Sequence, residues 1–190
     1  MYGMVNKAIE EMITSRYGER TWETIKALAG VDVDVFISNE AYPDAITYEL
    51  VRAASEHLGL ASEAILEAFG MHWVLHTALE GYGVLLDAGG ATLPEFLCSL
   101  PTFHTRVALI FPNLTPPVFK VTELQRDSLH LHYVSRRQGL APFVVGILKG
   151  LGIRFRTEVV VSVVQCREQG AEHEEFLVTW NANANESSGS

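Results

Sequence analysis

Hydrophobic positions in the first half of the chain recur at the spacing of an α-helix. In segment 5–13 the apolar residues fall on one face and the charged residues on the other, and Gly18 follows as a stop signal. Asp44 and Ser62 carry side-chain oxygens, so we expect them to cap the first turns of two later helices. The further helices that this pattern predicts cover about 22–29, 44–57 and 62–79.

Glycine and proline residues in the middle of the chain predict where helices break, kink or end. Four glycines between Gly81 and Gly90 predict a break in helical structure. Another helix is expected over about 93–109, with Pro101 inside it as the cause of a kink. Helical structure should then end at the prolines that follow, which are Pro112, Pro116 and Pro117.

The second half of the chain changes to the alternating pattern of β-strands. The apolar run at 143–155 predicts a helix, and it separates two expected hairpins, the second of which turns at Gly170. The segments with strand character are 118–124, 129–134, 159–165 and 175–180.

These elements predict one α+β domain. Its helical N-terminal half should pack on a C-terminal antiparallel sheet with helices, over residues 1–182. Segment 183–190 is rich in Asn and Ser and is expected to be a disordered tail.

Composition narrows the class of protein. Apolar residues make up 48% of the 190, which suffices for a core without metal or disulfide support. A net charge of −9 with only 14 Lys and Arg argues against partners that are nucleic acids or anionic membranes. The two cysteines lie far apart, and no uncharged run is long enough to be a membrane span or signal peptide. We therefore expect a cytoplasmic protein.

Common catalytic motifs are missing from the sequence. It contains no GxSxG, no HExxH and no P-loop lysine motif, so we expect no enzyme activity. His72 and His76 have a spacing that can chelate a metal, but a third ligand is not evident. They are interpreted as an ordinary histidine pair.

A group of polar residues follows the second expected strand. Alternate side chains of a strand share a face, so Tyr133, Ser135 and Arg137 should present two hydroxyls and a guanidinium together. Such a group can bind a carboxylate, because arginine offers a planar pair of donors. The alternative is a polar strand edge that faces solvent.

These three residues, called the clamp from here on, occur together with further motifs along nearly the whole chain. Together they resemble the haem nitric oxide/oxygen-binding (H-NOX) family, which includes bacterial gas sensors and the haem domain of soluble guanylate cyclase. The motifs are Met1-Tyr2-Gly3, Ala68-Phe69-Gly70, a helical His104, Thr115-Pro116-Pro117, the YxSxR of Tyr133 to Arg137, and Gly139-Leu140-Ala141-Pro142.

The resemblance implies a haem b (Fe protoporphyrin IX) cofactor buried between the helical half and the sheet. His104 matches the proximal ligand of the iron, a role that suits a neutral imidazole. Tyr133, Ser135 and Arg137 match residues that hold the haem propionates, and Asp44 matches an acidic residue that orients the arginine. Asp44 is equally well explained as a helix cap.

The resemblance also assigns the pocket around the porphyrin. Pro117 matches a proline that packs on the ring, and Val5 and Ile147 match apolar residues that press on it. Phe143 stands where oxygen-binding members carry a tyrosine that donates to bound oxygen. Trp73 falls at another distal position, either as an N–H donor or as simple packing. We therefore expect binding of nitric oxide and carbon monoxide without a stable oxygen complex.

Some bacterial members carry a Cys/His zinc site near the C-terminus. Cys166 and His173 remain here, but Glu174 replaces an adjacent cysteine, so we expect no such site. The family pattern implies signalling by rupture of the His104–iron bond. The partner would be a histidine kinase or a cyclic-nucleotide or cyclic-dinucleotide enzyme. Two alternatives are a haem-free module for an anionic effector and a peroxidase, although Phe143 and Trp73 do not supply a distal acid/base pair.

Overall fold

Helices fill the first half of the protein and strands most of the second, as the two hydrophobic periods predict. A computed structural model describes residues 1–110 and 115–181, with the backbone alone at 81, 82, 109 and 110. The elements are α1 Gly3–Tyr17, α2 Glu19–Leu28, α3 Asp44–Leu58, α4 Ser62–His72, the π-helical turn η1 Trp73–Thr77, α5 Ala78–Asp87, α6 Leu93–Ile110, β1 Val118–Thr122, β2 Ser128–Val134, α7 Ala141–Arg154, β3 Val159–Gln165, the 3-10 turn η2 Arg167–Gln169, and β4 Glu174–Trp180.

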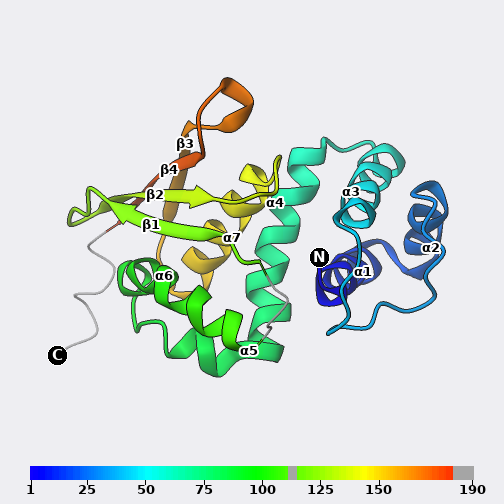
Figure 1. Cartoon of the computed structure of the whole chain (residues 1–190), viewed down its shortest axis with the longest axis horizontal. Helices are drawn as coiled ribbons and strands as arrows, with labels where there is room; N and C mark the ends of the chain where they lie inside the picture. The colour runs from blue at the N-terminus through cyan, green and yellow to red at the C-terminus, as the bar shows by residue number, and fades with distance from the viewer. Residues whose placement is uncertain (111–114, 182–190) are drawn as a thin grey trace.

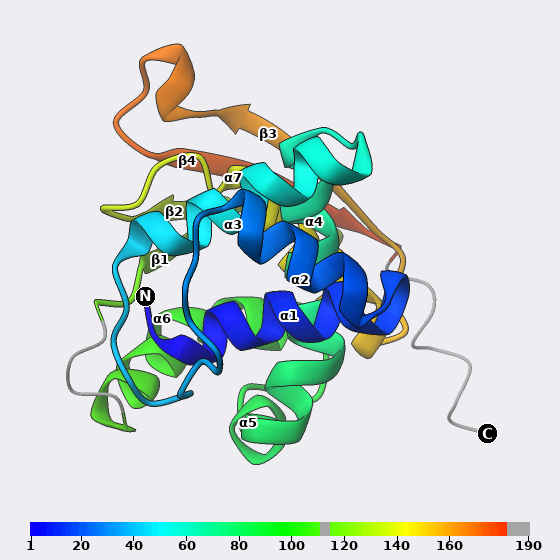
Figure 2. The same ribbon diagram turned by 90° about the vertical axis from the view of Figure 1, so that its right-hand side faces the viewer.

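Helix α4 stands at the centre of the molecule. Figure 1 shows α1, α2 and α3 on one side of it, and α7 and the sheet on the other. Figure 2, seen from the α1–α3 side, shows these helices in front of α4, with the β3–β4 hairpin projecting at one end and α5 at the other. The helical layer and the sheet layer therefore meet around α4 and α7.

The sheet is antiparallel with the strand order β1-β2-β4-β3. Its inward face is apolar because alternate residues of each strand point the same way. In β2 these are Leu129, Leu131 and Tyr133, and in β4 they continue through Phe176 and Val178. The α+β fold predicted from the sequence is confirmed.

The middle of the chain departs from the prediction. The break expected from Gly81 onward is wrong, since α5 continues to Asp87 and the chain turns only at Gly89 and Gly90, where Gly90 has φ 147°. A glycine within a helix costs only about 1 kcal/mol, and burial of apolar residues such as Leu86 offsets this. The long helix from Ser62 is interrupted by the π-helical turn η1.

The two expected helix caps are also wrong. The N-cap positions of α3 and α4 are Pro43 and Ala61, and neither helix has a side-chain cap hydrogen bond. The Asp44 carboxylate instead contacts groups far away in the sequence. Pro101 lies within α6 as expected.

Strand β2 ends at Val134, so Ser135 and Arg137 follow it in a loop instead of continuing the strand. The chain must reverse before α7 begins at Ala141, and Gly139 with φ 71° supplies that turn. Pro112 and the predicted tail 183–190 lie outside the described residues. No helix in the described ranges combines the length and apolar character needed to span a bilayer.

Candidate functional site

An apolar cavity of about 230 Å³ lies where the N-terminal helices, α4, α6, α7 and the inner face of the sheet meet. A second cavity of about 190 Å³ adjoins it and shares several lining residues. The first is lined by all five residues predicted to surround the porphyrin, which are Val5, Trp73, Pro117, Phe143 and Ile147. His104, Tyr133 and Arg137 line it as well. The structure thus brings these eight positions from distant segments to one cavity.

His104 lies in α6 and lines both cavities. Its Nδ1 is 3.2 Å from the carbonyl oxygen of Leu100, one turn earlier in the helix. A carbonyl oxygen can only accept, so Nδ1 carries the proton and Nε2 keeps a free lone pair. Burial lowers the pKa of His104, against a smaller effect of the Leu100 hydrogen bond. The imidazole is therefore neutral and suited to bind a metal ion through Nε2.

Arg137 is held beside the cavity by an ion pair across the fold. Its Nε donates to Asp44 Oδ2 at 2.8 Å, and one terminal nitrogen donates to the Thr115 carbonyl oxygen at 3.2 Å. The other terminal nitrogen is 3.4 Å from Asp44 Oδ1. The second N–H of each terminal nitrogen makes no hydrogen bond to the described residues, so the guanidinium can still bind a carboxylate.

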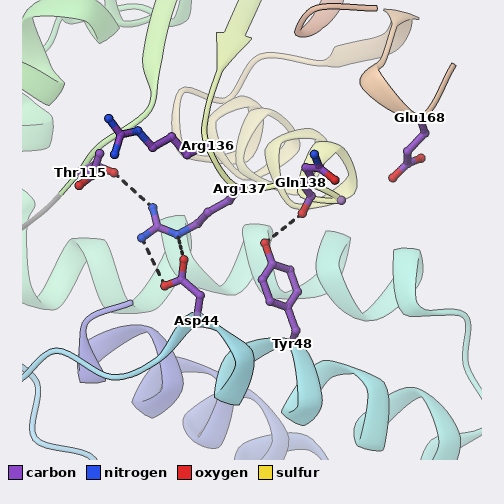
Figure 3. Close-up of a pocket in the computed structure, with 8 residues that line it drawn as sticks. Asp44, Tyr48, Thr115, Arg136, Arg137, Gln138 and Glu168 are labelled. Atoms are coloured by element: carbon purple, nitrogen blue, oxygen red, sulfur yellow. Dashed lines mark hydrogen bonds and ion pairs between the residues drawn. The ribbon is translucent and has the colours of Figure 1, made fainter. Parts of the chain in front are cut away.

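Asp44 stays ionised beneath this arginine. Burial alone raises the pKa of its carboxyl, but hydrogen bonds from the Met1 amine and from Arg137 outweigh it and lower the pKa. Figure 3 shows Arg137 reaching down from the loop after β2 towards Asp44 at the start of α3. The charged pair therefore links the sheet half to the helical half.

The two hydroxyl groups of the clamp differ in their position relative to the cavity. Tyr133 is 4% exposed and lines the apolar cavity, and burial raises its pKa, so its hydroxyl remains a donor. Ser135 Oγ accepts the backbone N–H of Arg137 at 3.1 Å, and Ser135 does not line either apolar cavity. Its side chain thereby shapes the loop, while a hydrogen bond to Tyr133 partly offsets the effect of burial on the tyrosine pKa.

The cavity wall formed by α4, η1 and α7 is aromatic. The Phe69 ring lies 4.9 Å from Phe143 and 6.1 Å from Trp73, measured between ring centroids. Phe143 offers carbon atoms only. Trp73 is the first residue of the π-helical turn η1, and such turns displace the following residues from the regular helical register.

Sequence reasoning missed the residues that hold the loop after β2. Tyr48 of α3 donates to the Gln138 carbonyl oxygen at 3.0 Å, as Figure 3 shows. Arg167 in η2 donates to the carbonyl oxygens of Ser135, at 2.8 Å, and of Arg137. Its Nε also pairs with Glu174 at 2.9 Å. A sequence signal existed, because Glu174 stands in phase with the buried positions of β4 and predicts a buried ion pair there.

The other histidine and cysteine candidates are placed apart from this cavity. His72 and His76 stack with ring centroids 4.6 Å apart, and burial, with the charge of His76, lowers the pKa of His72 to about 4. Cys166 is buried, while His173 Nε2 lies 3.0 Å from His132 Nδ1. Within residues 1–110 and 115–181, no group of three or more His, Cys, Asp or Glu side chains is placed to hold a metal ion. The absence of a zinc site stays a prediction.

Three comparisons relate this chain to known proteins. The family model described as Haem-NO-binding matches residues 2–163. Soluble guanylate cyclase gcy-31 of Caenorhabditis elegans is 29% identical over 165 residues, which are 86% of this chain and 24% of that protein. The soluble guanylate cyclase subunit beta-2 of Rattus norvegicus is 33% identical over 127 residues, 64% of this chain and 19% of that one. The chain spans about a quarter of the length of the first such relatives.

Solved structures share the fold at lower identity. An H-NOX protein from S. oneidensis in the Fe(II)NO ligation state has a TM-score of 0.87 at 19% identity, covering 95% of this chain and 99% of that one. The unliganded Fe(II) H-NOX protein from K. algicida has a TM-score of 0.84 at 21% identity, covering 97% and 98%.

Proposed function

This chain belongs to the haem-NO-binding family, and from that premise we propose that it is a haem-based sensor of nitric oxide that also binds carbon monoxide. H-NOX domains are sensor domains and not catalysts, and the cyclases related to this chain match it over about a quarter of their length. We therefore infer that the domain itself is not an enzyme, and that it works in the cytoplasm.

The observation that carries the proposal is the pairing of two groups at one cavity. His104 supplies a neutral imidazole, and Arg137 supplies two N–H donors, and among the described residues neither these donors nor His104 Nε2 has a hydrogen-bond partner; the lining between them is apolar. Haem b has the complementary chemistry, with an iron at its centre and carboxylates at one edge. We assign His104 as the axial ligand and Arg137, Tyr133 and Ser135 as the propionate clamp, with Asp44 supporting Arg137.

Haem bound here would supply a ferrous iron that takes a diatomic gas as a further ligand. The side chains around it decide which gas is retained. Val5, Phe143 and Ile147 contribute no hydrogen-bond donor, and bound oxygen depends on such a donor far more than nitric oxide does. In this assignment Pro117 would pack against the ring, and Trp73 would lie beside it, either as an N–H donor or as simple packing. We therefore propose selection against oxygen.

Signalling is proposed to begin with release of His104. Helix α6 carries His104 and packs on β1, so freeing its imidazole would change the contacts of α6 with the sheet. A partner senses the change only if it binds the two states with different affinity. The cyclase relatives favour a cyclic-nucleotide enzyme as that partner, and a histidine kinase or a cyclic-dinucleotide enzyme is the other choice.

The test is the absorption spectrum of the purified ferrous protein and of a His104→Gly variant. We expect a haem Soret band that shifts with nitric oxide and with carbon monoxide but not under oxygen. His104→Gly should shift the band, added imidazole should restore it, and the clamp should retain part of the haem. The matched control is His57→Gly, at an exposed position near the end of α3.

A Soret spectrum unchanged by His104→Gly would refute the assignment of the iron ligand. A colourless protein that takes up no added haem would refute the haem proposal and favour a haem-free module for an anionic effector.

A further inference from the structure

The loop between β2 and α7 carries the two polar clamp residues that lie outside the sheet. Three of its backbone carbonyl groups accept hydrogen bonds from side chains of other elements. Those of Ser135 and Arg137 accept from Arg167, and that of Gln138 accepts from Tyr48. The loop is therefore held from two sides, by η2 and by α3.

Arg167 binds the loop at two points. Its two terminal nitrogens donate to the carbonyls on either side of Arg136, which fixes the backbone that carries the Arg137 side chain. A planar guanidinium suits this task, because its N–H donors keep a fixed relative direction. A lysine ammonium has no such fixed geometry.

The Nε of Arg167 pairs with a buried carboxylate. Glu174 is 3% exposed, and its Oε1 accepts from Arg167 Nε at 2.9 Å. Glu174 is also the register partner of Tyr133 across the β2–β4 ladder. The pair therefore adjoins all three clamp residues. Arg167 contacts the backbone of Ser135 and Arg137, and Glu174 lies next to Tyr133 on the neighbouring strand.

Such a pair is a poor source of stability by itself. Burying two charges costs solvation free energy that their attraction only partly returns, and apolar replacements are often as stable. Glu174 Oε2 is buried and has no hydrogen-bond partner among the described residues, which adds to that cost. Its position next to the clamp, opposite Tyr133, points to a role other than stability.

We propose that Arg167, held by Glu174, is a positioning residue for carboxylate binding, which fixes the loop so that the Arg137 guanidinium faces the propionates. This inference rests on the proposed haem function. Arg167 itself contacts backbone and Glu174, and it acts through Arg137.

The experiment measures the rate at which haem leaves the loaded protein for an excess of apomyoglobin. Arg167→Ala should speed haem loss by about tenfold, the effect of losing roughly one charged hydrogen bond. Arg137→Ala should speed it at least as much. In the double variant the two effects should not multiply, because Arg167 acts through Arg137. Arg167→Lys should lie between wild type and Arg167→Ala.

A second measurement uses haem dimethyl ester, whose propionates are neutral. If Arg167 positions the carboxylate clamp, Arg167→Ala and wild type should lose the ester at the same rate. An acceleration as large with the ester as with haem would overturn the proposal and leave a general structural role. Should Arg167→Ala fail to fold, Arg167→Lys decides by the same comparison.

The matched control is Arg154→Ala. Arg154, at the C-terminal end of α7, has a similarly covered side chain, 16% exposed against 17% for Arg167, and forms an ion pair with Asp87 at the end of α5. The Arg154→Ala substitution should lower the unfolding temperature of the apoprotein without changing the rate of haem loss. If wild type binds no haem, the proposed function fails. If Arg137→Ala speeds haem loss and Arg167→Ala does not, this inference alone fails.

Discussion

Individual polar side chains at the cavity are each held by a partner before any ligand binds. The Leu100 carbonyl fixes the proton of His104 on Nδ1, and Asp44 fixes the direction of Arg137. Groups that are held in advance lose little conformational entropy when a ligand arrives. Phe143 lines the cavity and offers no donor, and it stands where oxygen-binding members of the family carry a tyrosine, so it offers the sharpest test of gas selection.

Replacing Phe143 by tyrosine adds a hydroxyl to the aromatic cavity wall, beside Phe69. The hydroxyl can donate to polarised oxygen in an apolar surrounding, so we expect oxygen affinity to rise about tenfold or more. Nitric oxide affinity should change far less. Oxygen titration of the ferrous protein measures this, with Phe143→Leu as a control that alters volume without adding a donor. An oxygen affinity equal in the tyrosine and leucine variants would contradict this account of selectivity.

At the scale of elements, the crossing of α4 and α7 fixes the width of the cavity. Their backbones approach through two glycines. A Cβ on Gly146 would lie 2.0 Å from the Glu67 carbonyl oxygen, and one on Gly70 would lie 2.2 Å from that of Phe143. Because these contacts are to backbone, a larger residue moves a whole helix and not a flexible side chain.

Gly146→Ala should lower the free energy of unfolding by about 3 kcal/mol, since the added methyl forces α4 and α7 apart. Urea unfolding of the apoprotein measures it. Gly83→Ala in α5 is the control, because its added Cβ has no heavy atom within 4 Å among the described residues outside its own stretch of helix. That change should be neutral or stabilise by about 0.5–1 kcal/mol. Equal losses in the two variants would show that the helix crossing is not tightly packed.

On the scale of the whole molecule, residues from both halves of the chain line the cavity. Folding therefore also buries histidine side chains that are exposed to solvent in the unfolded chain. Burial lowers the pKa of His104 and, together with the charge of His76, that of His72 to about 4. An unfolded chain takes up these protons near pH 6.5, whereas the folded protein does not until lower pH. The unfolded state therefore binds more protons in this range, and stability falls as the pH falls.

We expect the apoprotein to lose stability as the pH is lowered from 6.5 towards 4. The His72 share should be about 1–2 kcal/mol, reduced from the full value because the ring is partly exposed to solvent. Urea unfolding of wild type and His72→Gln over this range tests it, and the variant should lose less. The control is His57→Gln at an exposed site. A pH dependence identical in His72→Gln and wild type would exclude the assigned contribution.

How far the sequence alone leads can be judged from particular segments. The hydrophobic period predicted α1, both hairpins and α7 within a few residues, because periodicity reports local geometry and burial together. The motifs also identified the cavity residues, among them His104, Phe143 and Arg137. The glycines of α5 led to a wrong prediction, because burial of Ala78 and Leu86 outweighs a weak local preference.

The sequence by itself determined the types of element and the chemical groups available for a ligand. The tertiary structure decided where those groups meet. Asp44 and Arg137 are 93 positions apart, and Arg167 lies 32 positions from Ser135, so no local pattern reveals either contact. The first was expected only from the family resemblance, and the second was missed. Such contacts form only when α3, the β3–β4 hairpin and the loop after β2 pack together. Their energies depend on burial and on partners supplied by the whole fold.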